Sequence, residues 1–371
     1  MNILILGNGF DIAHGLDTRY TDFLNYCQAQ FYKLPSYKPS NCYFTNMWLR
    51  HFLNITNKIG NNWIDLETEI HKVIHFIAKT APFDTQGGYG LFNLNFDDAN
   101  FNFYNIENYL SKQFAGLGVD KKEYVRLDEH NWIEYRIYFA SLNGFINFLY
   151  DQLRDFALLF KNYLKNEVLK PMPLDSQYKL SLKTKNKNVY VLSFNYTNTC
   201  VKLYDNNVNA DSDFKIKPVY VHGNITNNNK CNLVFGTQTF EINPSKIPLP
   251  THFNIFQKHY QRHKYQTIEP YQELIRQIKK SRSIPKFHII GHSLDRTDRK
   301  ILKHILQAKD DCIINIYFHN EEMQKILMDR INDIIGEDEV MSKVRFIHQH
   351  EDERSILKPK NQTTWLPSTS K

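Results

Sequence analysis

The sequence predicts an α/β protein with a Rossmann-like, doubly wound and mostly parallel sheet that carries a large α-helical insertion. Short apolar runs rich in β-branched residues recur along the chain, and most are continuous, which is typical of strands buried on both faces of a parallel sheet. Helical segments lie between several of these runs, as right-handed strand, helix, strand crossovers require. A long segment of different character separates the first run from the second, and it is too long for an ordinary connection.

Six segments are predicted to form the sheet. They are Asn2–Leu6, Asn188–Phe194, Pro218–His222, Lys286–Ile290, Cys312–Phe318 and Val344–His348. Between the later strands, Thr297–Leu306 is predicted as a helix because its aliphatic residues share one face and Thr297 stands at the capping position. A second helix is expected to begin after Asn320, with glutamates in its first turn, and to end at Gly336.

The interruption between the first two strands also predicts the domain organisation. Residues 1–34 and 186–352 are expected to form the Rossmann-like core, and residues 35–185 the helical insertion subdomain. Residues 353–371 are expected to form a C-terminal tail. The length of 371 residues suits this organisation, since a domain usually takes about 150 residues.

Within the insertion, Trp63–Lys79 is predicted as one helix and Trp132–Leu169 as a long helical region. The second prediction rests on apolar residues from Leu142 to Tyr163, which recur at spacings of three and four. This stripe is interpreted as core packing or a subunit interface, and we expect a homo-oligomer. Gly87–Phe103 is interpreted as a long loop, either a lid over the site or an ordinary surface loop.

Composition excludes several classes of protein. Hydrophobic residues make up 42% of the chain and charged residues 23%, which excludes global disorder and a small disulfide scaffold. No window approaches the length of apolar sequence that crosses a bilayer, and the opening MNILILGNG lacks the features of a signal peptide, so we expect no membrane association. The five scattered cysteines form no CxxC pair, which favours a reducing cytoplasm.

The net charge of +7 is modest for a protein of this length. The densest basic stretch is Lys258–Lys286, which is interpreted as a solvated helical face rather than a nucleic-acid site. The aromatic and glycine patterns of known nucleic-acid readers are missing from it, so nucleic acid is not expected as a partner.

The first motif that predicts chemistry is Gly7-Asn8-Gly9-Phe10-Asp11, directly after the first strand. A sharp turn into Gly-x-Gly lets the backbone approach a phosphate, and amides at the start of the next segment are donors to it. Ile12 stands where the full dinucleotide fingerprint has its third glycine, which disfavours a standard Rossmann dehydrogenase. The alternative is a tight turn that needs two glycines.

Three more polar clusters follow predicted strands. They are Ser193-Phe194-Asn195-Tyr196-Thr197, His222-Gly223 and Gly291-His292-Ser293-Leu294, the last with Asp295 and Asp298 nearby. Each has a structural alternative: an Asn that satisfies local backbone groups, a structural His, and a simple strand-to-helix loop. Because the carboxyl ends of parallel strands meet at one edge of a sheet, we expect all four clusters to share one site.

Other candidates for chemistry are weaker. His71 and His75, like His259 and His263, are spaced four apart on predicted helices, but neither pair has an HExxH carboxylate or an evident third ligand. No metal is therefore expected. Glu67, with Asp65 beside it, either projects toward the cleft or is a salt-bridged or solvated carboxylate.

Five segments carry a resemblance that spans nearly the whole chain. They are ILILGNGFDIAHGLDTRYTDFL, the Trp63-Ile64-Asp65-Leu66-Glu67 segment, SFNYTN, VHGNI with Phe235-Gly236 following, and IIGHSLDRTD. Together they resemble the AbiH family of bacterial abortive-infection proteins. That resemblance implies a role in phage defence, with a phage component or a defence partner as the trigger.

The same motifs, in the same order, are similar to the sirtuin-like fold of many anti-phage proteins. This similarity implies that Asn195 and His222 are catalytic and that NAD is the substrate. It implies nucleotide contacts at the matching positions Gly7, Gly9, Gly291 and Ser293, and we extend the expected binding segments to Asn8, Phe10 and His292.

This chain also departs from the sirtuin pattern. Thr197 stands where an Asp is usual, Asp11 stands where a Ser is common, and the four-Cys zinc module is absent, so protein deacetylation is not expected. If the site splits NAD, we expect Asn195 to orient the ribose and the attacking water and His222 to accept a proton. Asp11 is expected either to stabilise the developing cation or to cap the turn.

Two classes of function stay open at this stage. The first is an NAD hydrolase that shuts down infected cells by breaking the bond between nicotinamide and ribose. The second is a nucleotide-binding sensor or signalling module that acts in phage defence without turnover. A nuclease ranks below both, because no clustered carboxylate set for two metals is evident.

Overall fold

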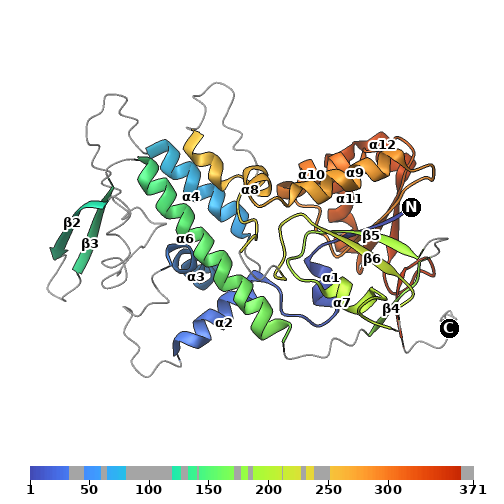
Figure 1. The fold of residues 1–371 in the computed structure, drawn as a ribbon, viewed down its shortest axis with the longest axis horizontal. Coiled ribbons are helices and arrows are strands. Elements are labelled where there is room, and N and C mark those ends of the chain that lie inside the picture. The colour runs from blue at the N-terminus through green and yellow to red at the C-terminus, as the bar shows by residue number, and fades with distance from the viewer. Residues whose placement is uncertain are drawn as a thin grey trace. The chain divides into compact units, whose positions relative to one another are not determined.

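A computed structural model describes residues 1–32, 46–59, 65–80, 119–126, 133–139, 142–170, 177–182, 187–210, 212–226, 231–237 and 251–360 (Figure 1). The chain forms two compact units, each built from segments that are distant in the sequence. The first unit comprises Met1–Thr18, Leu164–Leu233 and Tyr265–Lys371. The second unit comprises Arg19–Tyr163 and Val234–Lys264. These boundaries differ from the predicted 35–185 insertion, since the second unit begins earlier and takes in a later segment.

A six-stranded sheet forms the centre of the first unit. Its strands are β1 (Asn2–Leu6), β5 (Asn188–Ser193), β6 (Lys215–Tyr220), β7 (Lys286–Ile290), β8 (Ile313–Phe318) and β9 (Val344–His348). They pair in the order β6-β5-β1-β7-β8-β9, and every pairing is parallel. If these six strands are numbered 1 to 6 in chain order, their order in the sheet is 3-2-1-4-5-6, which is that of a Rossmann sheet. The order reverses between β1 and β7. The predicted α/β fold is confirmed.

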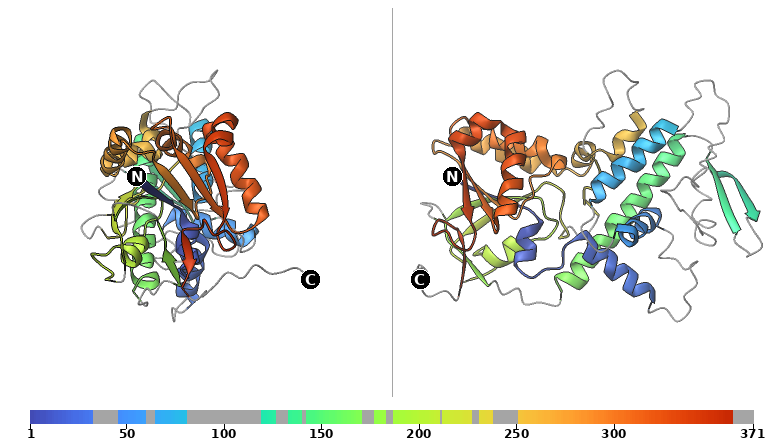
Figure 2. Two further views of the ribbon diagram at one scale, coloured as in Figure 1. Left: turned by 90° about the vertical axis from the view of Figure 1, so that its right-hand side faces the viewer. Right: turned by 180° about the vertical axis from the view of Figure 1, so that it is seen from behind.

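Helices cover both faces of this sheet (Figure 1). They are α1 (Asn8–Ala13), α7 (Thr199–Tyr204), α9 (Ile268–Lys280), α10 (Arg299–Leu306), α11 (Glu321–Ile335) and α12 (Glu337–Lys343). A π-helical segment, η3 (Leu164–Val168), and a 3-10 turn, η5 (Arg296–Asp298), also belong to the unit. Figure 2 shows the strands and helices from two further directions.

The ends of two helices test the predicted capping residues. Asn320 caps α11 as predicted, because its side chain accepts a hydrogen bond from the Met323 amide at 2.8 Å. Thr297 does not cap α10, which corresponds to the predicted helix Thr297–Leu306, so that prediction is wrong. The chain instead enters η5 at Asp295, whose carboxylate accepts from the Thr297 amide at 3.1 Å, and α10 begins two residues after Thr297. Asp298, the residue after Thr297, stands at the N-cap position of α10, and its side chain makes no capping bond.

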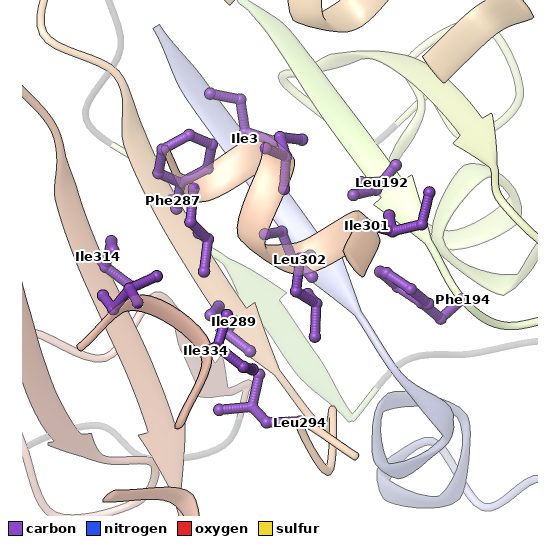
Figure 3. Packing of buried hydrophobic residues seen from close by; sticks show 14 of the residues in the cluster. Ile3, Leu192, Phe194, Phe287, Ile289, Leu294, Ile301, Leu302, Ile314 and Ile334 are labelled. Carbon is purple, nitrogen blue, oxygen red and sulfur yellow. The ribbon is translucent and has the colours of Figure 1, made fainter. Parts of the chain in front are cut away.

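The four central strands, β5, β1, β7 and β8, bury side chains on both faces of the sheet, which explains their continuous apolar runs. Ile3 and Ile5 of β1 pack on one face with α9, α10 and α11. Figure 3 shows Leu302 of α10 and Ile334 of α11, which are both buried on this face. Leu4 and Leu6 pack on the other face with Phe10 and the apolar side of α7. The two faces together hold the apolar surface whose burial drives folding of this unit.

A small two-stranded sheet closes the second face. β4 (Tyr178–Leu180) pairs antiparallel with β10 (Leu357–Pro359), and Leu180 and Leu357 join the core beneath them. The start of the expected C-terminal tail is therefore an ordered strand. The pairing partner lies more than 170 residues earlier, and a three-residue strand has no sequence signal of its own.

The second unit is mostly helical. Its elements are α2 (Tyr20–Tyr32), α3 (Met47–Ile59), α4 (Leu66–Thr80), the hairpin of β2 (Val119–Arg126) and β3 (Ile133–Phe139), α6 (Leu142–Tyr163), the 3-10 helix η4 (Thr251–Phe256) and α8 (Lys258–Lys264). The predicted helix at Trp63–Lys79 corresponds to α4. The prediction of one helical region over Trp132–Leu169 is wrong at its start, where IEYRIYF alternates in the manner of a strand and forms β3. The predicted loop Gly87–Phe103 lies outside the described residues.

Aromatic side chains fill the core of this unit. Phe156 and Phe160 of α6 lie within 5.8 Å of the rings of Phe23 on α2 and of Phe235. Phe52 of α3 packs against Phe156 with its ring centroid at 5.1 Å. The described part of the predicted apolar stripe on α6 is therefore core packing.

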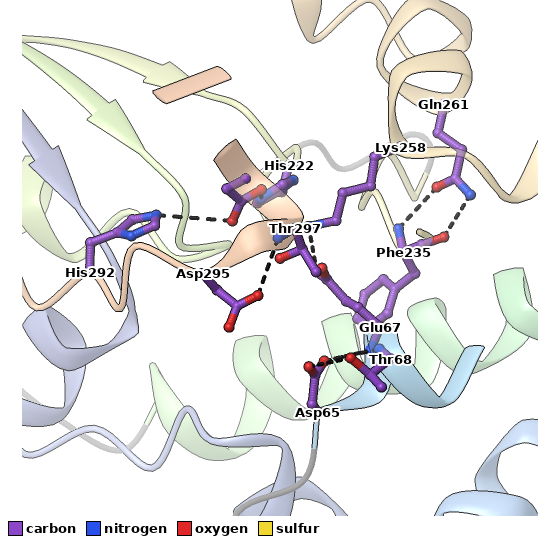
Figure 4. Close-up of polar contacts among 11 residues, drawn as sticks. Asp65, Glu67, Thr68, His222, Phe235, Lys258, Gln261, His292, Asp295 and Thr297 are labelled. Atoms are coloured by element: carbon purple, nitrogen blue, oxygen red, sulfur yellow. Dashed lines mark hydrogen bonds and ion pairs between the residues drawn. The ribbon is translucent and has the colours of Figure 1, made fainter. Parts of the chain in front are cut away.

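The basic stretch Lys258–Lys286 is a solvated face only in part: Arg276, Lys279 and Lys280 of α9 are exposed, whereas the start of α8 is buried. Lys258 is only 1% exposed, and its ammonium lies 2.6 Å from the Glu67 carboxylate (Figure 4). Gln261, one turn later on α8, exchanges hydrogen bonds with the backbone of Phe235. Of the two interpretations of Glu67, a side chain that projects toward the cleft and a salt-bridged or solvated carboxylate, the salt-bridged carboxylate is confirmed. Sequence composition could not show this, because a buried lysine needs a specific partner far away in the chain.

Within the described ranges, no helix combines the length and the apolar character that crossing a membrane requires. Cys27, Cys200 and Cys312 are buried free thiols. Cys42 lies outside the described residues.

The core beneath α10 gives a first prediction. Leu302→Ala removes a side chain that is fully buried against the sheet, and we expect the free energy of unfolding of the first unit to fall by about 2–5 kcal/mol. Lys303→Ala, an exposed position on the same helix, is expected to change it by less than about 0.5 kcal/mol. Urea denaturation followed by circular dichroism measures both, and equal losses in the two variants would contradict the packing described here.

Candidate functional site

The loops after β1 and β7 meet where the strand order reverses. The Gly7 amide donates to the Ile290 carbonyl at 3.1 Å, and the Gly9 amide donates to the Gly291 carbonyl at 2.8 Å. The Phe10 amide donates to the Gly7 carbonyl at 2.9 Å. The turn and the start of α1 are therefore bonded directly to the loop after β7. This is the sheet edge at which α/β proteins bind ligands.

Glycine is required at this junction because the two backbones are in contact. A Cβ atom on Gly7 would lie 2.4 Å from the Cα atom of His292. Gly291 has a φ of +62°, and a Cβ atom there would lie 2.2 Å from the Phe10 amide nitrogen. The tight-turn alternative thus has a clear structural basis. Nucleotide binding by these glycines stays a prediction.

The other predicted binding residues differ in exposure. Asn8 is exposed, and its side-chain oxygen accepts from the Thr18 hydroxyl at 2.6 Å. Ser293 is exposed, and its carbonyl accepts from the Arg330 guanidinium at 2.7 Å. Phe10 is only 2% exposed and packs in the core, so its side chain serves the fold at this position.

Asn195 ties a third loop to this junction. It follows β5, is only 6% exposed, and its side-chain amide donates to the Gly7 carbonyl at 2.9 Å. The neighbouring Ser193 hydroxyl accepts from the Asn195 backbone amide at 3.2 Å. The loops after β1, β5 and β7 are therefore held together by polar contacts at one sheet edge, as the shared-site hypothesis requires.

Asp11 lies on α1, which begins at this junction, and is only 1% exposed. The Thr197 hydroxyl donates to Asp11 Oδ2 at 2.5 Å, and the Thr199 hydroxyl donates to Thr197 Oγ1 at 3.0 Å. Burial raises the pKa of Asp11 from 3.8 to about 6, although Thr197, Thr199 and Asn195 act in the opposite direction. Thr197, in the loop after β5, is thus a hydrogen-bond donor to a carboxylate on α1.

Two buried oxygens of this group lack a donor among the described residues. They are Oδ1 of Asp11 and Oδ1 of Asn195. A buried acceptor that makes no hydrogen bond costs about 1–3 kcal/mol, so each such atom needs a partner such as a ligand or an ordered water. Their presence next to the loop junction indicates a place for a group that donates hydrogen bonds.

His222 comes two residues after β6 and is only 4% exposed. Its ring centroid lies 5.5 Å from that of Phe194 and 6.2 Å from that of Tyr196, the residues on either side of Asn195. Its Nε2 atom lies 3.1 Å from Oδ1 of Asp298. The structure therefore places His222 beside the loop that carries Asn195.

His292 is buried beside the same carboxylate. Its Nδ1 atom accepts from the Leu294 amide at 2.9 Å, and its Nε2 atom lies 4.0 Å from Oδ2 of Asp298 (Figure 4). Its ring packs edge-on against Phe194 with the centroids 4.3 Å apart. In the sequence, Asp298 stands out only as a residue near the Gly291–Leu294 segment. The available signal was its position four residues after Leu294, where a short turn can bring a side chain back to the strand ends.

No group of three or more His, Cys, Asp or Glu side chains in the described part of the chain has the arrangement of a metal site. His71 and His75 stack with their ring centroids 5.8 Å apart on α4. His259 and His263 are both exposed on α8.

The fold and the site together define a Rossmann-like α/β protein in which polar and titratable side chains gather at the carboxyl edge of the parallel sheet. The family model described as bacteriophage abortive infection AbiH matches residues 3–319. This chain therefore belongs to the AbiH family, as its motifs predict, and that membership indicates a role in phage abortive infection. No curated protein and no solved structure matches the chain.

The burial of Asp11 predicts a pH dependence of stability. Because its folded pKa lies near 6, above its ordinary 3.8, the folded protein binds this proton more tightly than the unfolded chain. The free energy of unfolding should fall by about 3 kcal/mol as the pH rises between these values. Asp11→Asn should remove that fall, so the variant becomes the more stable protein at pH 8.

Urea denaturation at several pH values, with Asp213→Asn as an exposed control, measures this contribution. The control variant should keep the pH dependence of the parent protein. If Asp11→Asn and the parent lost stability in parallel from pH 4 to pH 7, Asp11 would not be the responsible group.

The backbone contact at Gly291 predicts a second stability effect. Gly291→Ala forces a Cβ atom against the α1 backbone, and we expect it to separate the two loops and to destabilise the protein by more than about 3 kcal/mol. Gly15→Ala is the matched control, since Gly15 also has positive φ, +76°, but has open space around it. That variant should lose only about 1 kcal/mol. Thermal denaturation compares the two, and similar melting temperatures would argue against the contact.

Proposed function

We propose that this AbiH protein is an NAD hydrolase whose activity shuts down infected cells. The reaction breaks the bond between nicotinamide and ribose and adds water, giving nicotinamide, ADP-ribose and a proton. The proposed catalytic residues are Asn195, His222 and Asp11. The setting is the cytoplasm, with a phage component or a defence partner as the trigger and a homo-oligomer as the active form.

The buried acceptor oxygens of Asp11 and Asn195 are the main support for this proposal. A ribose carries neighbouring hydroxyl groups, which are hydrogen-bond donors of the kind that these oxygens lack. A phosphate has no such donors at neutral pH and would be repelled by the Asp11 carboxylate. The ribose of a nucleotide is thus the part of a ligand that suits this position.

The same residues suit the charge that develops in the reaction. Loss of nicotinamide leaves positive charge on the ribose, and a carboxylate in a site of low dielectric stabilises such charge. At neutral pH Asp11, with a pKa of about 6, is mostly ionised. His222 accepts the proton from water or from a ribose hydroxyl, while Asn195 orients both reactants. Nicotinamide leaves as a neutral molecule and needs no strong acid.

The rest of the nucleotide is assigned to the loops after β1 and β7. The amides of Gly7, Gly9 and Phe10 already donate to protein carbonyls. A pyrophosphate would therefore take its hydrogen bonds from the exposed Asn8 and from other groups in the first turn of α1. The adenosine half is assigned to Gly291, His292 and the exposed Ser293.

A nucleotide sensor without turnover is the second candidate function. The observation in its favour is that three amides of the glycine turn are already bonded within the protein. Thr197, which replaces the usual Asp of the sirtuin pattern, is also engaged with Asp11. In this case binding of a nucleotide would be the signal, and catalysis would play no part.

Purified protein incubated with NAD separates the two functions. We expect release of nicotinamide and ADP-ribose, measured by chromatography, and a rate reduced at least about 100-fold in Asn195→Ala and in His222→Ala. His263→Ala, an exposed histidine on α8, should keep the rate of the parent protein. The assay is repeated in extract from phage-infected cells, which supplies the trigger.

Absence of turnover under both conditions, together with NAD binding by calorimetry that the two variants weaken, would favour the sensor. Turnover that survives both substitutions would place the chemistry elsewhere in the chain.

A further inference from the structure

We infer that Asp298 is the positioning residue of this site, because its carboxylate fixes the orientation and the tautomer of His222. This inference rests on the proposed function for its catalytic meaning. The contact itself joins a histidine after β6 to the turn that precedes α10, so it links loops from two strands on opposite sides of β1.

The position of Asp298 in its own helix supports this role. Asp298 is the N-cap residue of α10, and an Asp at that position ordinarily bonds to the amides of the first turn. Here its side chain makes no such bond. Oδ1 lies 3.1 Å from Nε2 of His222, and Oδ2 lies 4.0 Å from Nε2 of His292. The carboxylate is thus directed at the two imidazoles instead of its own helix.

The tautomer of His292 follows from its hydrogen bond. Its Nδ1 atom accepts from the Leu294 amide, so in the neutral ring the proton lies on Nε2, which faces Asp298. One carboxylate oxygen therefore lies toward the N–H group of His292. The other oxygen is the acceptor for His222.

The tautomer of His222 follows in turn. Its Nε2 atom faces a carboxylate oxygen at hydrogen-bond distance, so in the neutral ring the proton belongs on Nε2. Nδ1 then carries the lone pair that accepts the proton in the proposed reaction. The rings of Phe194 and Tyr196 pack against the imidazole and restrict its rotation. Asp298 sets which nitrogen is the base, without contacting the substrate itself.

Asp298→Asn tests this inference because an amide offers one acceptor oxygen in place of two. His292 keeps its Nε2 proton, since the Leu294 amide donates to its other nitrogen. This N–H group favours the amide orientation in which the oxygen of Asn faces His292, because the other orientation would set two donors against each other. His222 then faces an NH₂ group, and its proton should move to Nδ1. Asp295→Asn is the matched control: it is a carboxylate three residues earlier that caps η5 and does not pair with either histidine.

Tautomers are read from long-range ¹H–¹⁵N correlation spectra of the full chain labelled with ¹⁵N-histidine. The His222 signals are assigned by their loss in His222→Gln. The inference predicts an Nε2–H tautomer for His222 in the parent protein and in Asp295→Asn, and an Nδ1–H tautomer in Asp298→Asn. Identical His222 signals in both Asn variants would overturn it. This readout does not depend on NAD turnover, so it decides the role of Asp298 even if the proposed function fails.

Kinetics with NAD provide the second readout where turnover is present. The kcat of Asp298→Asn should fall by about 10²- to 10⁴-fold with KM within about threefold of the parent value, because the base is misplaced while ribose contacts remain. Asp295→Asn should keep both parameters. An equal loss in the two variants, or a change confined to KM, would contradict a positioning role.

Discussion

The direct backbone contact between the loops after β1 and β7 is the constraint on which the rest of the site depends. Gly7 and Gly9 stand against Gly291 and His292 with no room for a Cβ atom. This contact fixes the start of α1, and thereby Asp11. It also fixes the Gly7 carbonyl, to which Asn195 donates. A site made from loops of four strands thus derives its geometry from one junction of main chain.

Much of the fold could be predicted because its signals are local. The strand runs at Asn2–Leu6 and Lys286–Ile290 have the predicted bounds, since burial on both faces leaves an unbroken apolar run. Val344–His348 also has the predicted bounds, although it is an edge strand in which only Ile347 is buried. The Asn320 cap and the Gly336 terminus of α11 are also predictable, because capping residues are a local signal in the sequence. The β3 strand was missed because its apolar residues adjoin those of α6, and a window across both has no single period.

The sequence predicts which residues lie at the site, but it does not predict which of them form hydrogen bonds or ion pairs with one another. Asn195 and His222 could be grouped because parallel strands end at one edge, yet nothing local shows that Thr197 bonds to Asp11 or that Asp298 faces two histidines. Thr197 and Asp11 are 186 residues apart and Asp298 and His222 are 76 apart, so both pairs depend on the three-dimensional junction. Lys258 illustrates the same limit in the second unit, where its burial depends on Glu67, far earlier in the chain.

The order of the strands has a consequence for synthesis of the protein. β1 is made first but lies at the centre of the sheet, between β5 and β7, whose first residues are Asn188 and Lys286. Its neighbours therefore leave the ribosome long after it does, and contacts of such sequence separation form slowly. A chain that stops before Gly291 has no partner for Gly9 and no turn that carries Asp298. For a protein whose proposed activity harms its own cell, incomplete translation products are thereby left without an assembled site.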